Sequence, residues 1–260
     1  KLGHDVTIIT STISSIFDYY TAKYDKNIKS HEYRKSGFTV MRQPFSINVL
    51  NKLRKLGKLQ ILINKIEPDL IYVHTAPLNI GPALSYKGLN RDCIVIFDSH
   101  ADFSNSANNW LSLNLLHKIV YRLVLKKYYK RLDNIFYVTP GGGDFLNRIY
   151  RIPKTHLSLL PLGVDSDYIE EIRGNRQDLR RELAIEQNDF VIFAGGKLDL
   201  RKKIELVVKS FLRLDIVNCH LIIVGDTPDL EYKQTLFDLV NRHPRVHFTG
   251  WLEGRKVYDY

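Results

Sequence analysis

The chain has 260 residues, of which 44% are hydrophobic and 25% are charged, a composition typical of a folded globular protein. It contains no apolar run as long as the roughly 18 residues that a membrane-spanning helix needs. The formal net charge of +10 predicts a polyanionic partner, such as nucleic acid, an acidic lipid surface or a phosphorylated small molecule. Cys93 and Cys219 lie within apolar runs, so we expect buried free thiols and a reducing, cytoplasmic setting.

Short apolar runs alternate with amphipathic stretches along the chain. The opening residues predict the end of a helix that leads into a strand, not a signal peptide. The predicted strands are Val6–Thr10, Phe38–Met41, Leu70–His74, Cys93–Phe97, Ile135–Thr139, Leu157–Leu160, Phe190–Ala194, Leu221–Val224 and Val246–Thr249. The predicted helices are Asn51–Ile66, Leu111–Leu132, Lys202–Leu214 and Leu230–Arg242. Continuous apolar strands are typical of sheets buried on both faces, so the pattern predicts an α/β fold with doubly wound parallel sheets.

A change in this rhythm predicts a domain boundary. Proline and glycine interrupt the segment Pro161–Asn175, and the alternation of strands and helices starts again at Phe190. We therefore predict an N-terminal domain over residues 1–163 and a C-terminal domain over residues 164–260. The second domain has only three predicted strands, so we expect it to be incomplete in this chain.

Ligands of open parallel sheets bind beyond the carboxyl ends of the strands, where one polar cluster follows Phe97. His100 stands between Asp98 and Asp102, which suits proton transfer or the binding of a sugar hydroxyl. The alternative is a histidine that only caps the following loop. His74 also ends a strand but has no carboxylate beside it in sequence, so we favour a packing or loop role there.

A glycine and lysine segment follows the strand that ends at Ala194. Glycines allow a ligand to approach the backbone, and the start of a helix attracts anions. Together with the basic side chains, this predicts a diphosphate site, although a solvated basic turn gives the same pattern. The residues of this predicted site are Gly195, Gly196, Lys197, Arg201 and Lys202, with Lys203 beside them.

Two further glycine segments follow strands. Gly225 and Asp226 form a tight turn at a strand end, which by itself indicates only a change of chain direction. The run Gly141–Gly143 precedes a helix, and it can either line a cleft or form a flexible loop.

Two of the predicted helices are basic and amphipathic. Asn51–Ile66 carries five Lys or Arg residues among apolar ones, and Lys118–Leu132 carries six. Such helices can lie on anionic membranes, although ordinary surface packing gives the same composition. We predict membrane contact first for Asn51–Ile66.

Six segments, in order along the chain, resemble the retaining GT-B glycosyltransferases of family 4, also called glycosyl transferases group 1. They are Leu2–Ile8, Asp98–His100, Pro161–Asp165, Gly195–Lys202, Leu221–Asp226 and Val246–Gly250. Each segment is only moderately specific, whereas six in family order are a strong signal. The resemblance spans essentially the whole chain and implies a fold of two Rossmann-like domains.

The resemblance also implies roles for individual residues. His100 and Asp98 would lie near the transferred sugar as the catalytic pair. Lys197, where the family more often has Arg, and Lys202 would hold the donor diphosphate. Lys203 replaces the usual Gly. The residues expected near the nucleotide are Gly225, Asp226 and Trp251.

The implied activity is transfer of a sugar from a nucleotide-diphosphate donor to a glycan or lipid-linked acceptor, in surface polysaccharide or glycolipid synthesis. We expect no cofactor, no metal and no specific nucleic acid. The family's Gly-rich first loop and Glu-x7-Glu segment are not in this sequence, so we expect a chain truncated at both ends. A nucleotide-sugar 2-epimerase of the same fold and an inactive basic binding module are the alternatives.

Overall fold

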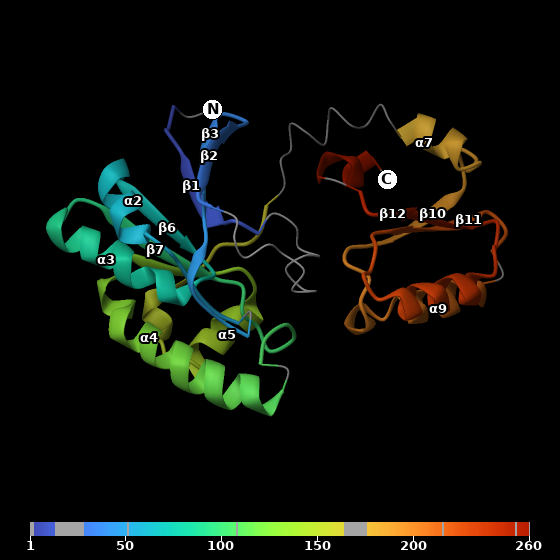
Figure 1. The fold of residues 1–260 in the computed structure, drawn as a ribbon. Helices are drawn as coiled ribbons and strands as arrows, with labels where there is room; N and C mark the ends of the chain where they lie inside the picture. Colours follow the sequence, from blue (N-terminus) through green and yellow to red (C-terminus); the bar gives the residue numbers. More distant parts are fainter. Residues whose placement is uncertain are drawn as a thin grey trace. The chain divides into compact units, whose positions relative to one another are not determined.

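The structure is a computed structural model that describes residues 3–13, 29–50, 52–107, 109–163, 176–214, 216–252 and 254–259. The chain divides into two compact units, Lys1–Gly163 and Val164–Tyr260 (Figure 1). Leu2, Val164, Asp165 and Gly174, which belong to predicted motifs or to the predicted boundary, lie outside the described residues.

The first unit contains a parallel sheet of four strands in the order β6-β7-β8-β9. These strands are β6 (Leu70–His74), β7 (Ile94–Ser99), β8 (Asn134–Tyr137) and β9 (Leu157–Leu159). Helices α3 (Ile80–Leu89), α4 (Arg122–Tyr128) and α5 (Pro140–Arg148) supply Leu84, Leu125 and Phe145 to the core beneath this sheet. The short helical segments η1 (Pro77–Asn79), η2 (Ser112–Tyr121), η3 (Tyr129–Arg131) and η4 (Lys154–His156) complete this part of the unit.

Among the described residues, the two faces of this sheet differ in how deeply they are buried. Val95 and Phe97 lie in the core, whereas Leu70, Tyr72 and Ile94 are exposed on the other face. Because side chains alternate across a strand, Leu70, Tyr72 and Ile94 share one face, and burial on that face increases towards Asp98 at the carboxyl end of β7.

A second sheet of the first unit has the order β1-β3-β2. Its strands β1 (Thr7–Ser11) and β3 (Phe38–Gln43) are parallel, whereas β2 (His31–Lys35) is antiparallel to β3. All five residues of β2 are exposed, and the sequence analysis missed this strand because it has no apolar run.

The helix predicted over Asn51–Ile66 is wrong in its first half. Strands β4 (Phe45–Val49) and β5 (Leu53–Leu56) form an antiparallel hairpin, and helix α2 covers only Leu59–Ile66. Lys58 adopts a left-handed backbone with φ of 54° just before α2, which separates the helix from the strand. The single apolar face needed for membrane contact through this segment is therefore not continuous, and Asn51 lies outside the described residues.

The second unit is a parallel sheet in the order β10-β11-β12. Its elements are α7 (Arg176–Glu182), β10 (Phe190–Gly195), η5 (Leu200–Lys202), α8 (Ile204–Leu212), β11 (Cys219–Val224), α9 (Leu230–Val240), β12 (Val246–Gly250) and η6 (Gly254–Asp259). Every residue of β11 is buried. Leu221 and Ile223 face a core with α8 and α9, whereas Ile222 and Val224 pack with Ile185 on the other face. The prediction of a strand covered on both faces is confirmed here.

The expectation for the two cysteines is confirmed. Cys93 and Cys219 are free and buried. No described helix is long and apolar enough to cross a membrane.

Candidate functional site

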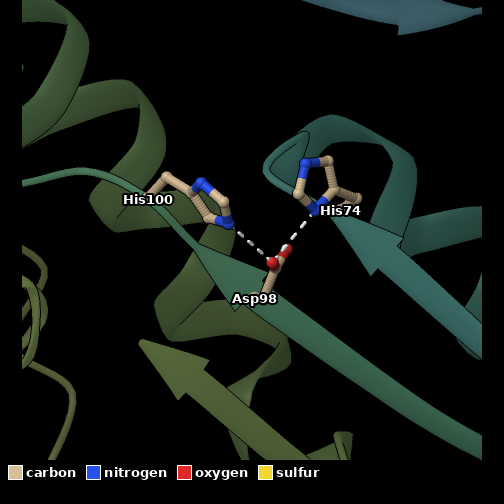
Figure 2. Close-up of side chains that lie close together, drawn as sticks. All are labelled: His74, Asp98 and His100. Carbon is tan, nitrogen blue, oxygen red and sulfur yellow. Dashed lines mark hydrogen bonds and ion pairs between the residues drawn. The ribbon is translucent and has the colours of Figure 1, made fainter. Parts of the chain in front are cut away.

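The polar cluster of the first unit is organised by one buried carboxylate. Asp98, near the carboxyl end of β7, is 2% exposed, and its Oδ1 accepts a hydrogen bond of 3.0 Å from the backbone N–H of Thr75. Its Oδ2 lies 2.9 Å from Nδ1 of His74 and 3.1 Å from Nε2 of His100 (Figure 2). A carboxylate only accepts hydrogen bonds, so these two ring nitrogens are the protonated ones.

The parallel sheet brings the two histidines together across neighbouring strands. His74 ends β6 and is paired with Asp98 in the register, and its ring meets that of His100 edge-on at 4.8 Å between centroids. The expectation that His74 has no carboxylate beside it holds in the sequence and is wrong in space. Burial and a hydrogen bond to Asp98 raise the pKa of the neighbouring Tyr72 to about 12, so this hydroxyl stays protonated.

His74, Asp98 and His100 also offer three ligand atoms that lie within 4.8 Å of one another. Two imidazoles and a carboxylate are a donor set that suits zinc and other divalent metals. The sequence analysis expected no metal because no His or Cys pair has ligand spacing along the chain. The fold places two such histidines together, and both ring nitrogens that face Asp98 would have to give up their protons to bind an ion.

The second carboxylate predicted beside His100 has a different partner. Asp102 accepts hydrogen bonds from the backbone N–H of Ser104 and from the hydroxyl of Thr139, and these lower its pKa. It thus joins the loop after β7 to the start of α5, where Thr139 is the N-cap. The carboxylate leaves no room for a side chain at Gly141, whose Cβ would lie 2.5 Å from Asp102 Oδ2.

The glycine run at the start of α5 is therefore a packing feature and not a flexible loop. Gly141–Gly143 belong to the first turn of the helix, and a Cβ at Gly143 would lie 3.0 Å from the ring of Tyr137. These contacts hold the segment that carries His100.

The predicted diphosphate site of the second unit is built by backbone contacts. Parallel pairing aligns the carboxyl ends of β10, β11 and β12, and these are followed by Gly196, Gly225 and Trp251. Gly196 donates its N–H to Val224 O at 2.9 Å, and Gly225 donates to Gly250 O at 2.8 Å. A Cβ at Gly225 would lie 1.8 Å from Gly196 O, so the two loops touch where only glycine fits. We call Gly195, Gly196 and Gly225 the glycine junction.

The basic side chains of this site have different surroundings. Arg201 forms an ion pair of 2.9 Å with Asp199, whose carboxylate also accepts the N–H of Arg201. Burial alone would raise the pKa of Asp199, but the bonds to Arg201 and the charge of Lys197 lower it. Lys202 is exposed in the η5 turn. The structure thus places Lys197 and Lys202 on the loop after β10, while Arg201 holds that loop together.

The helix after this loop starts later than predicted. Lys202 belongs to η5, Lys203 adopts a left-handed backbone with φ of 51°, and α8 begins at Ile204. The lysines therefore precede the first turn of the helix.

Asp226, predicted near the nucleotide, is engaged by its own unit. Lys233 of α9 lies 2.8 Å from Asp226 Oδ1, and the same oxygen accepts the N–H of Thr227. Burial opposes ionisation, but these bonds lower the pKa of Asp226 and keep it charged. Sequence reasoning missed Lys233 because it lies one turn inside a helix, with nothing local to indicate its partner.

Comparison with known proteins identifies relatives of both units. The profile described as Glycosyltransferase Family 4 matches residues 1–168, and that of Glycosyl transferases group 1 matches residues 175–260. Mannosylfructose-phosphate synthase of Agrobacterium fabrum is 24% identical over 170 residues, which are 61% of this chain. The match spans only 36% of that relative's length.

Solved structures resemble the fold. HepE of Anabaena, in complex with UDP-glucose, has a TM-score of 0.57 at 16% identity, covering 82% of this chain and 56% of its own. A glycosyltransferase from Rickettsia africae has a TM-score of 0.62 at 14% identity, covering 99% of this chain and 63% of its own. At these identities the likeness shows the fold, and the fold is GT-B with two Rossmann-like units.

Proposed function

Since the chain belongs to glycosyltransferase family 4 and continues into a group 1 domain, we propose that it transfers a sugar from a nucleotide-diphosphate donor, with retention, to a glycan or lipid-linked acceptor. The proposed role is cell-surface polysaccharide or glycolipid synthesis at the inner face of the cell membrane. Two free thiols support a reducing, cytoplasmic setting. We propose UDP as the first nucleotide to test, because the Anabaena relative of this fold is solved with UDP-glucose.

The observation that carries the proposal is the glycine junction. Gly196 and Gly225 keep side chains away from the carboxyl edge of the β10–β12 sheet, where ligands of such sheets bind. A diphosphate can approach the backbone there, with Lys197 and Lys202 on the adjoining loop.

The proposed mechanism assigns these lysines to the leaving group. As the glycosidic bond breaks, negative charge builds on the nucleotide diphosphate, and Lys197 and Lys202 stabilise it. We propose that these cations take the role that a metal ion has in other transferases, so that neither a metal nor a cofactor is required. The acceptor hydroxyl then attacks the same face of the sugar.

His100 and Asp98 are proposed to act in the first unit. Asp98 accepts the Nε2 proton of His100 and so selects the ring tautomer in which Nδ1 can accept a proton or a hydroxyl hydrogen bond. His100 is 33% exposed, which leaves it accessible to a substrate, whereas Asp98 acts from beneath it. Asp98 is thus a positioning residue for His100.

The test is the rate of nucleotide release from UDP-glucose after Lys202→Ala. Loss of a group that stabilises charge in the transition state lowers turnover about 10²–10³-fold, and we expect at least a tenfold loss at saturating donor. Lys209→Ala, on the exposed side of α8, is the matched control and should keep the wild-type rate. A rate within twofold of wild type for Lys202→Ala would remove the assigned role.

Product analysis tests the reaction class. A transferase yields glycosylated acceptor and free nucleotide in equal amounts. An epimerase yields an epimeric nucleotide sugar without stoichiometric release of nucleotide, and a binding module yields neither product.

A further inference from the structure

The helix formed by η2 and α4 lies at the outer edge of the first unit (Figure 1, green). Every fourth residue of this helix packs against the core, and we call these residues the inward row. Leu113, His117, Tyr121 and Leu125 form this row, with His117 and Leu125 buried. η2 is a π-helix, in which residues two positions apart lie on roughly opposite sides, and the exposed side chains of Leu115 and Ile119 show that the row that starts at Leu111 faces outward from the unit.

The outward row is apolar. Leu111, Leu115, Ile119 and Leu123 are each between 49% and 64% exposed, and Trp110, which precedes them, is 76% exposed. Scattered exposed leucines are ordinary, but an aligned row of four after a tryptophan is a contiguous apolar face. A partner that buried these side chains would remove apolar surface from water, which favours association.

The charges beside this row all have one sign. Residues 103–132 contain six Lys or Arg residues and no Asp or Glu. Lys118, Arg122 and Lys126 are also spaced by four residues. Lys118 and Arg122 directly precede Ile119 and Leu123 of the outward row, and Lys126 continues the same spacing. They therefore form a cationic row along one flank of the apolar row.

We propose that the η2–α4 face, defined as Trp110, the outward row and the flanking cations, docks on the surface of an anionic lipid bilayer. Leucines and isoleucine enter the boundary between headgroups and acyl chains, Trp110 lies at that boundary, and the cations contact lipid phosphates. The one-signed charge favours this occupant over a second copy of the chain, because two such faces would bring their three flanking cations against three others.

A basic hollow at the end of the same helix supports an anionic partner. Lys127 and Arg131 line it together with Lys55 of β5, Gln60 and Ser85. Its three cations come from β5, α4 and η3, and we assign it to the phosphate of a lipid headgroup.

Vesicle flotation tests this proposal with the chain as it stands. Wild type should bind vesicles that contain phosphatidylglycerol and should bind pure phosphatidylcholine weakly. The variant Leu115→Ser, Ile119→Ser, Leu123→Ser should lower the partition coefficient at least about tenfold, since it removes three inserted side chains. Its matched control replaces exposed leucines elsewhere, Leu89→Ser, Leu206→Ser and Leu230→Ser, and should bind as wild type does.

Charge and orientation are tested separately. Substituting Gln for Lys118, Arg122 and Lys126 should weaken binding to the anionic vesicles about fivefold for each positive charge removed. The chain has two tryptophans, so Trp251→Phe leaves Trp110 as the reporter and Trp110→Phe leaves Trp251. Lipids brominated on the acyl chain should quench Trp110 strongly and Trp251 little.

Three results would overturn the proposal: serine variants that bind like wild type, equal quenching of both tryptophans, or dimerisation without lipid that the triple serine variant abolishes. The last would assign the face to a second copy. Near-UV circular dichroism checks that each variant is folded. Because these measurements need neither donor nor acceptor, their failure is distinguishable from failure of the proposed transfer activity.

Discussion

The two units build their candidate sites in opposite ways. In the first unit, side chains converge on one buried carboxylate, and Asp98 accepts hydrogen bonds from groups that include Thr75, His74 and His100. In the second unit, the backbone itself forms the site, and Gly196 touches Gly225 where no Cβ fits. A site made of side chains loses function group by group, whereas a site made of backbone fails when any side chain is added.

The largest effect should follow from adding one methyl group to the glycine junction. In Gly225→Ala the Cβ would meet Gly196 O at 1.8 Å, and the backbone φ of 131° is itself unfavourable for alanine. We expect a loss of about 3 kcal/mol or more in the free energy of unfolding of the second unit, with loss of UDP binding. Urea unfolding, monitored by Trp251 fluorescence, measures the free energy of unfolding, and calorimetry measures UDP binding.

Gly250→Ala is the control for this comparison. Gly250 has φ of 72° but no atom within 4 Å of its Cβ position. It should cost only about 1 kcal/mol through backbone strain. If both variants lose the same free energy of unfolding, the contact between the two loops does not add to the effect of backbone strain.

The next largest effect should be a loss of stability of the first unit at acid pH. Burial, with a smaller effect of Lys52, lowers the pKa of His117 to about 4, below the ordinary 6.5. Above pH 6.5 the ring is neutral in both states, and between 6.5 and 4 only the unfolded chain takes up the proton. Stability should therefore fall as pH falls through this window, by about 3 kcal/mol in total.

Unfolding followed by Trp110 fluorescence at a series of pH values measures this slope. His117→Gln removes the titrating ring, retains an amide for the Tyr150 hydroxyl, and should flatten the profile between pH 6.5 and 4. An unchanged slope in the variant would assign the acid sensitivity to other groups. In the second unit, burial and His220 also lower the pKa of His247, so the same sign is expected with Trp251 as the reporter.

His100 and His74 should differ in how much each contributes to the rate of sugar transfer. His100→Ala should lower transfer about 10²-fold, at the lower end of the usual range for loss of a proton-transfer group. His74→Ala should lower it about threefold, since Asp98 keeps Thr75 and His100 and loses one orienting partner. Initial rates measure both, and His31→Ala in exposed β2 is the control. An unchanged rate for His100→Ala would leave that residue a structural role only.

The smallest effect should be a gain in the stability of the second unit. Lys203 holds a left-handed backbone between η5 and α8, at the position where the family resemblance implies glycine. Lys203→Gly relieves this strain and should stabilise the second unit by up to about 1 kcal/mol, less the entropy that glycine adds to the unfolded chain. A denaturation midpoint below that of wild type would contradict this prediction.

Much of the sheet could be predicted because buried strands carry their own signal. β6 was predicted at its observed ends, and β11 was predicted within two residues. The hairpin β4–β5 was missed because Leu53–Leu56 is followed by the apolar residues of α2, and the two read together as one amphipathic helix. Only the turn at Gly57 and Lys58 separates them, and the hydrophobic pattern does not report it.

The candidate sites were predictable to a different degree. Asp98, His100 and the glycine loops stand out because each follows a strand, and the ends of parallel strands meet at one edge. His74 and Lys233 did not stand out, because their partners lie 24 and 7 residues away in sequence. The ion pair of Arg201 with Asp199 was equally hidden, since a row of basic residues does not show which of them is neutralised.

The sequence by itself determined the succession of strands and helices, the family, and the residues that follow each strand. Apolar periodicity and glycine positions are local, so they are readable without knowledge of the fold. The tertiary structure decided which of these residues meet: two histidines on one carboxylate, two glycines in contact, and an apolar row left outside the core. Such contacts depend on strand order, register and helix rotation, which place residues distant in sequence within a few ångströms of one another.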